Sequence, residues 1–140
     1  MSKKAEPFRH FTIDARVWNS DVVVMIGGER RQRSRVLEKA GVPADSRDYW
    51  LGRMYDCAYG NDNFGALTMF TEAVPWDVYV FFPKTPDRAD IETVCSVTHE
   101  LLHAAIAILR RKNITLCPES EEAYTYLTEH LTRKFWGELK

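Results

Sequence analysis

The chain has 140 residues, of which 45% are hydrophobic, 12% aromatic and 28% charged, and its formal net charge is -1 at pH 7. This length and composition are typical of a globular domain with its own core and exclude a disordered chain, so we expect a single domain over residues 1–140. The nearly neutral charge gives no general attraction to nucleic acid or to anionic lipid, and we expect no nucleic-acid partner.

The first residues and the cysteines bear on cellular location. The opening segment, MSKKAEPFRHFTI, contains no apolar stretch of signal-peptide length, and no later segment approaches the roughly 18 apolar residues of a membrane span. The three cysteines, Cys57, Cys95 and Cys117, form no CxxC pair, which argues against a disulfide framework and a cysteine zinc site. We therefore expect a cytoplasmic protein, not bound to a membrane, whose cysteines are reduced core residues.

The first half of the chain predicts a hairpin followed by a helix. Phe11–Trp18 and Val22–Ile26 are rich in β-branched and aromatic residues, and the turn-forming residues 19–21 separate them. After two glycines, Glu29–Ala40 is a polar helix candidate that ends at a glycine and a proline. Residues 44–64 carry no clear pattern, and no element is predicted there.

The second half predicts two strands followed by two helices. Gly65–Phe70 and Val74–Phe82 are strand candidates that can pair with each other. A long helix is expected to start at residues 85–87 and to end at the basic residues 110–112, where cations suit the negative end of the helix dipole. A second helix is expected from residue 118 or 120 to about residue 136. This order predicts an α+β fold, in which a small mixed or antiparallel sheet packs on the long helix and on the C-terminal helix.

The segment VTHELLHAAIA, Val97–Ala107, lies in the long helix and contains the strongest chemical signal of the sequence. At about 100° per residue, His99 and His103 are only ~40° apart on one face, one turn apart along the axis. Both imidazoles can therefore reach one metal ion. Glu100 lies to the side of the pair, where a base acting on a metal-activated water is needed. In the HExxH motif the two histidines bind the metal and the glutamate is this base.

An ordinary amphipathic helix is the alternative explanation of this segment. The apolar residues of the helix fill about half of its circumference, and the histidines lie just past the edge of that arc. An accidental HExxH is expected about once in a hundred chains of this length and composition. The motif also lies on a predicted helix, as its mechanism requires, and the metal site is therefore the favoured interpretation.

A catalytic zinc site usually has a third protein ligand in addition to water. The extension HExxHxxGxxH is absent, because Ile106 and Leu109 occupy its glycine and third-histidine positions. The next helix opens with Glu119, Glu121 and Glu122, which lie 16 to 19 residues beyond the second histidine. Acidic residues suit a first helical turn whether or not a metal is present, so spacing alone leaves all three open as ligands.

Two segments, HELLH and SEEAYTYLTEHL, give the chain a resemblance to a known group of proteins. Over about Val74 to Trp136 it resembles a minimal gluzincin, a zinc metallopeptidase in which a glutamate of the following helix completes the HExxH site. It is similar to ImmA/IrrE-type metallopeptidases and to small HExxH proteins of tailed bacteriophages. Matching Glu122-Ala123 to their EA pair implies Glu122 as the third ligand, with Glu121 in reserve, because Tyr124 replaces the asparagine of the EAN motif.

The resemblance implies a zincin-like fold, a Zn²⁺ cofactor and hydrolysis of a peptide or protein substrate. His99, His103 and Glu122 would bind the zinc, and Glu100 would be the catalytic base. In zincins the strand before the active-site helix is often the edge that binds substrate, a position that VPWDVYVFF, Val74–Phe82, occupies here. An ordinary sheet strand is the favoured interpretation of this segment, because alternation alone cannot distinguish a substrate edge from any other edge.

The chain is also compatible with a function other than catalysis. A zincin-like protein of this small size can act by binding a protein partner, as a phage-type accessory or host-modulating factor in the host cytoplasm.

The basic cluster consists of Arg30, Arg31, Arg33 and Arg35. It contains no interleaved aromatic residues and is interpreted as a solvated helix face.

Overall fold

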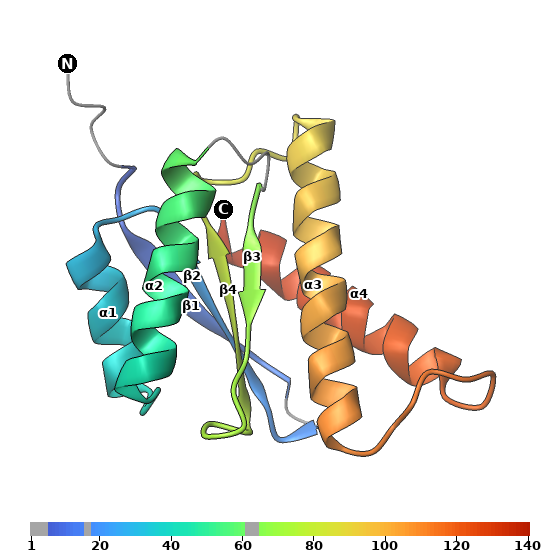
Figure 1. Ribbon diagram of the computed structural model, residues 1–140. Helices are drawn as coiled ribbons and strands as arrows, with labels where there is room; N and C mark the ends of the chain where they lie inside the picture. The colour runs from blue at the N-terminus through green and yellow to red at the C-terminus, as the bar shows by residue number, and fades with distance from the viewer. Residues whose placement is uncertain (1–5, 16–17, 61–64) are drawn as a thin grey trace.

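The computed structural model describes residues 6–15, 18–60 and 65–140, which form one mixed sheet with helices on both faces (Figure 1). The elements in chain order are β1 (Arg9–Asp14), β2 (Asp21–Ile26), α1 (Arg30–Lys39), α2 (Ala44–Tyr59), β3 (Leu67–Met69), β4 (Asp77–Phe82), α3 (Ile91–Arg111) and α4 (Glu121–Glu138). Within the described residues this is an α+β fold with four helices and a four-stranded mixed sheet. The predicted α+β class is confirmed, whereas only three of the four helices were predicted.

The strand order across the sheet is β1-β2-β4-β3. The outer pairs, β1 with β2 and β3 with β4, are antiparallel. The central pair, β2 with β4, is parallel. The two helices and β3 that separate these strands along the chain bring it back to the end of the sheet at which β2 began, so that β4 runs in the same direction. The predicted hairpin and the predicted pairing of the two later strands are therefore confirmed.

Each face of the sheet packs against its own pair of helices. Alternate residues of β2 point to opposite faces: Val22 and Val24 contact the core beneath α3 and α4, whereas Val23 and Met25 contact the core beneath α1 and α2. All six residues of β4 are buried. Burial on both faces explains the continuous apolar runs of the two central strands.

The long helix α3 starts later than the sequence predicts. The side chain of Asp90 accepts a hydrogen bond from the backbone N–H of Glu92 at 3.2 Å and caps the helix, so residues 85–89 form the loop before it. Arg110 and Arg111 lie in its last turn, as expected. The C-terminal helix α4 follows the prediction closely and ends two residues later.

Three other predictions need correction or qualification. The substrate edge that the resemblance implies at Val74–Phe82 is wrong, because β4 lies between β2 and β3, and β3 forms that edge of the sheet in the described part of the chain. The ordinary sheet strand is confirmed over Asp77–Phe82. The pattern-free segment contains the helix α2. The first strand, Arg9–Asp14, is shorter than the predicted Phe11–Trp18. Residues 16 and 17 of that prediction lie outside the described residues.

The cysteines are also less buried than expected. Cys95 and Cys117 are exposed, so the assignment of all three cysteines to the core is wrong, and Cys57 is half-buried. Among the described helices, α3 alone is long and apolar enough to cross a membrane by length and composition, with a mean hydropathy of 1.2. A core helix passes the same test, and α3 buries one face on the sheet, so this is weak evidence for a span.

Candidate metal centre

The two histidines of the HELLH segment are adjacent on the surface of α3. The Nε2 atoms of His99 and His103 are 3.1 Å apart, and the ring centroids are 4.7 Å apart with the rings nearly perpendicular. Both side chains are exposed. The structure therefore agrees with the helical spacing that placed them one turn apart on one face.

The distance between the two ring nitrogens suits shared coordination of one ion. Two nitrogens that each lie ~2.0–2.1 Å from a tetrahedral zinc are separated by about 3.3 Å. The observed 3.1 Å is close to that value and requires only a small side-chain adjustment. His99 and His103 therefore fit as two ligands of one ion.

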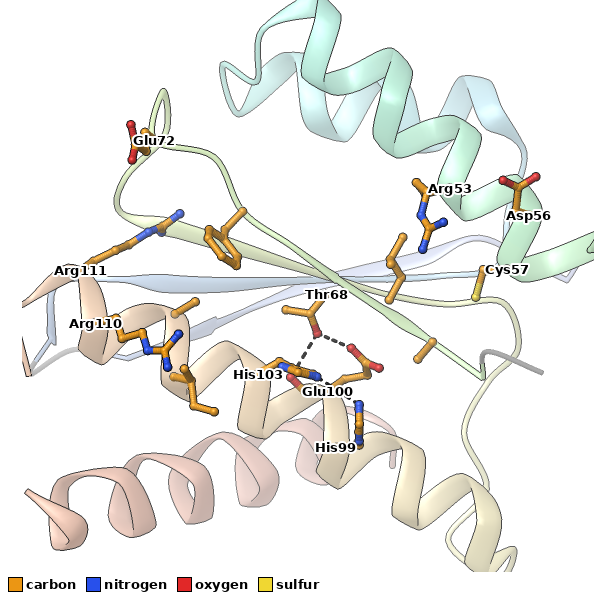
Figure 2. A pocket seen from close by; sticks show the side chains of 15 residues that line it. Arg53, Asp56, Cys57, Thr68, Glu72, His99, Glu100, His103, Arg110 and Arg111 are labelled. Carbon is orange, nitrogen blue, oxygen red and sulfur yellow. Dashed lines mark hydrogen bonds between the residues drawn. The ribbon is translucent and has the colours of Figure 1, made fainter. Parts of the chain in front are cut away.

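Glu100 lies beside this pair and points towards the edge strand (Figure 2). It is only 8% exposed, and its carboxylate accepts a hydrogen bond from the hydroxyl of Thr68 on β3. The same hydroxyl lies 3.2 Å from the backbone carbonyl of Glu100. Thr68 thus ties the middle of α3 to the sheet edge. No sequence pattern indicates this contact, because threonine is common in strands for other reasons.

A pocket of about 680 Å³ opens over His99, Glu100 and His103, at the sheet edge between α2, β3 and α3. Residues from all three elements line it, and Figure 2 shows Arg53 across the pocket from the histidines. Among the described pockets it is the one lined by His99, Glu100 and His103. Its dimensions are typical of sites for small molecules or short peptide segments.

Cys57 lies on the α2 side of this pocket. Burial raises the pKa of its thiol to about 11, and the negative charge of Glu100 adds to this effect, while Arg53 opposes it. The thiol is therefore protonated at neutral pH. A protonated thiol is a poor nucleophile, so Cys57 is not a reactive cysteine of this pocket.

Arg111 closes one end of the pocket by binding the chain that follows β3. Its guanidinium donates hydrogen bonds to the carbonyls of Asp77 at 2.7 Å, Pro75 at 3.0 Å and Thr71 at 3.2 Å. It also lies over the ring of Phe70, 5.2 Å from the centroid. These contacts fix the last turn of α3 against the loop between β3 and β4.

The predicted third ligand does not lie with the histidines in this structure. Glu119, Glu121 and Glu122 are exposed, and none of them lines the HELLH pocket. Glu121 instead borders an apolar groove between α3 and α4. In Figure 1, β3 and the first turn of α4 lie on opposite sides of α3. Within the described residues, no three His, Cys, Asp or Glu side chains are grouped to hold a metal.

Comparisons of this chain with protein-family models, with curated proteins and with solved structures found no match. The class defined by the fold and the site is therefore an α+β protein with an HExxH helix at a sheet edge. Its function has to be argued from these residues and from the sequence pattern.

Proposed function

We propose that the protein is a zinc-dependent hydrolase of peptide bonds with a zincin-like fold of the gluzincin type. The observation that supports this most strongly is the convergence of the His99 and His103 Nε2 atoms, 3.1 Å apart, at a pocket that also contains the Glu100 carboxylate. The two ring nitrogens also share a hydrogen bond at this distance, so the support for a metal comes from the position of the pair beside Glu100 in one pocket.

A bound zinc ion would polarise the scissile carbonyl and lower the pKa of a water towards 7. The residues of the chain have separate tasks around it. His99 and His103 bind the ion through Nε2, and Glu100 accepts the proton of the attacking water and passes it to the leaving amine. Thr68 holds the Glu100 carboxylate towards the pocket through its hydroxyl. A shielded carboxylate in a fixed position is well suited to this proton transfer.

The third ligand in this proposal is Glu122, with Glu121 as the reserve. Glu122 is exposed on the first turn of α4 and outside the pocket, so the ligand set is complete only when this turn approaches the histidines. A hydrogen bond of 2.6 Å from the Tyr124 hydroxyl to the Ile114 carbonyl joins this turn to the segment of residues 112–120, so the approach requires both to move together. Metal binding would then change the position of a turn that is already helical.

The proposed substrate is an extended peptide or a segment of a protein. The pocket follows β3, which has only one strand partner, β4, in the described part of the chain. The other side of an edge strand offers unpaired backbone groups to which an extended chain can add by hydrogen bonds. We place the protein in the cytoplasm, or in the host cytoplasm if a phage encodes it, in keeping with the sequence.

A second candidate is a zincin-like binding protein without catalysis, such as a phage-type accessory or host-modulating factor. Two observations favour it: the described residues contain no group of three metal ligands, and the Glu100 carboxylate is engaged in a structural hydrogen bond to Thr68. In this case Glu100 stabilises the contact between α3 and β3, and the pocket serves for recognition.

The experiment that decides between them measures zinc content and peptide hydrolysis of the same samples. We expect about one zinc per chain in the wild type and in Glu100→Gln, because Glu100 is not a ligand. His103→Gln should lose the zinc, whereas His10→Gln, on the exposed edge of β1, is the matched control and should keep it. Hydrolysis should fall about 100-fold or more in Glu100→Gln.

The two candidates then separate clearly. Wild-type protein without zinc after purification and after addition of zinc would exclude the metal site. Zinc retained in Glu100→Gln together with full hydrolytic activity would exclude Glu100 as the base. Zinc without hydrolysis of any peptide in the wild type would favour the binding protein.

A further inference from the structure

Three arginines line the HELLH pocket, and they are not equivalent. Arg111 is engaged by three backbone carbonyls and by the ring of Phe70, so its guanidinium holds the fold together. Arg53 is exposed on α2 and has no hydrogen-bond or ion-pair partner among the described residues, but it lies across the pocket from the helix that carries the histidines. Arg110 is exposed, and its guanidinium has no hydrogen-bond or ion-pair partner among the described residues.

Arg110 is in line with the histidine pair on α3. Seven residues separate it from His103, which is nearly two full turns and corresponds to about 10 Å along the axis. Arg110 therefore lies on the same face as the histidines and lines the same pocket (Figure 2). A substrate that extends from the histidine pair along α3 and β3 would therefore pass the Arg110 guanidinium.

The acidic residues of the pocket leave this cation uncompensated. Glu100 is turned towards Thr68, and Asp56 belongs to the α2 side. At the end of the pocket near Arg110, Glu72 is the acidic residue, and its negative charge acts on Arg111. Burial lowers the pKa of Arg111, and electrostatic interactions with Asp77, Tyr79 and Glu72 oppose that shift. A guanidinium without a partner offers a planar pair of donors that matches a carboxylate.

We infer that the substrate carries a carboxylate that binds Arg110, about three residues from the bond at the histidine pair. The spacing follows from the rise of an extended chain, about 3.3 Å per residue, set against the ~10 Å between Arg110 and His103. The carboxylate belongs either to an acidic side chain or to the free C-terminus of the peptide. This inference rests on the proposed function in taking a peptide as the ligand.

The test measures the binding of fluorescent peptides to zinc-loaded Glu100→Gln, and their cleavage by the wild type. The peptides have about ten residues, long enough to span the pocket when extended. One series moves a single Asp along the peptide and compares it with Asn at each position. A second series compares a C-terminal carboxylate with a C-terminal amide. The first series detects an acidic side chain and the second a free chain end.

Arg110→Gln is then compared with Lys112→Gln as the matched control. Both variants remove one positive charge from the end of α3, but Lys112 is exposed and does not line the pocket. We expect the acidic peptide to bind about 5- to 10-fold more tightly than its amide counterpart in the parent protein and in Lys112→Gln. This preference should disappear in Arg110→Gln, persist in part in Arg110→Lys, and weaken at high salt.

The inference fails if acidic and amide peptides bind equally, if no peptide binds, or if Arg110→Gln keeps the preference. These results are distinguishable from failure of the proposed function. Cleavage without preference for a carboxylate overturns the role of Arg110 and leaves the hydrolase in place. Binding that depends on Arg110 without cleavage by the wild type overturns the hydrolase and leaves the carboxylate site.

Discussion

Replacing Thr68 by valine tests the contact that positions Glu100. Valine keeps the volume and the β-branched shape of threonine, and it suits a strand, so the change removes little except the hydroxyl. That hydroxyl donates to the Glu100 carboxylate and lies 3.2 Å from its backbone carbonyl. In the part of the chain that the structure describes, the Glu100 carboxylate has no other hydrogen-bond partner.

The expected cost is about 2 kcal/mol in the free energy of unfolding. Hydrogen bonds to charged groups contribute about 1.5–3 kcal/mol, and a carboxylate that is only 8% exposed is poorly compensated by water. For a chain of 140 residues, 2 kcal/mol corresponds to a decrease in Tm of about 7 °C. The decrease should be the same with and without metal, because Thr68 and Glu100 are not ligands.

The assay is unfolding in urea and by heat, followed by circular dichroism. Thr12→Val is the matched control, since Thr12 is exposed on β1, and it should change stability by less than about 0.5 kcal/mol. In Glu100→Leu the hydroxyl of Thr68 has lost its carboxylate partner and keeps only the backbone carbonyl of residue 100, so adding Thr68→Val should cost about 1 kcal/mol less than it costs alone. Simple additivity of the two changes, or a Thr68→Val cost no larger than that of Thr12→Val, would refute the contact.

Three further predictions concern other groups. Asp21→Asn should stabilise the protein at pH 7 by under about 1 kcal/mol, because burial raises the Asp21 pKa in the folded state and solvent screens part of this effect; the gain should vanish below about pH 3.9 in pH-dependent urea unfolding. Iodoacetamide at pH 8 should label the exposed Cys95 and leave Cys57 largely unmodified by mass spectrometry, since burial raises the Cys57 pKa to about 11; equal labelling would contradict this. Zinc titration should show weaker binding in Glu122→Ala than in Glu121→Ala, because helix neighbours point ~100° apart and only one can face the histidines; the reverse order would make Glu121 the ligand.

The part of the site that depends on one helix was predictable from the sequence. His99, Glu100 and His103 lie as the helical period requires, because their relative positions are fixed within two turns of α3. The Thr68 contact was not predictable, since it joins residues 32 positions apart through the packing of α3 on β3. Contacts between elements depend on how the sheet is assembled, and no local pattern specifies that.

The errors in the fold have physical causes of the same kind. The helix α2 was missed because only Trp50, Leu51 and Met54 of its 16 residues are buried and no side chain caps its start, so its helical period is weak. The interior position of β4 could have been found, because the run DVYVFF is apolar on both faces and an edge strand rarely is. The parallel pairing of β4 with β2 places β3 at the sheet edge.

The contacts of α3 divide the candidate centre into a fixed part and an adjustable part. Thr68 holds the middle of the helix to β3, and Arg111 holds its last turn to the loop that follows, so the helix and the sheet edge behave as one rigid wall of the pocket. The histidine side chains lie outside these contacts and are exposed. The core does not depend on them, so a metal at this centre is not needed to form the sheet or its helices, in contrast to a structural zinc site that replaces a core. What a metal would change is the position of the first turn of α4, which carries the proposed ligand Glu122 and is held away from the histidines by the buried Tyr124.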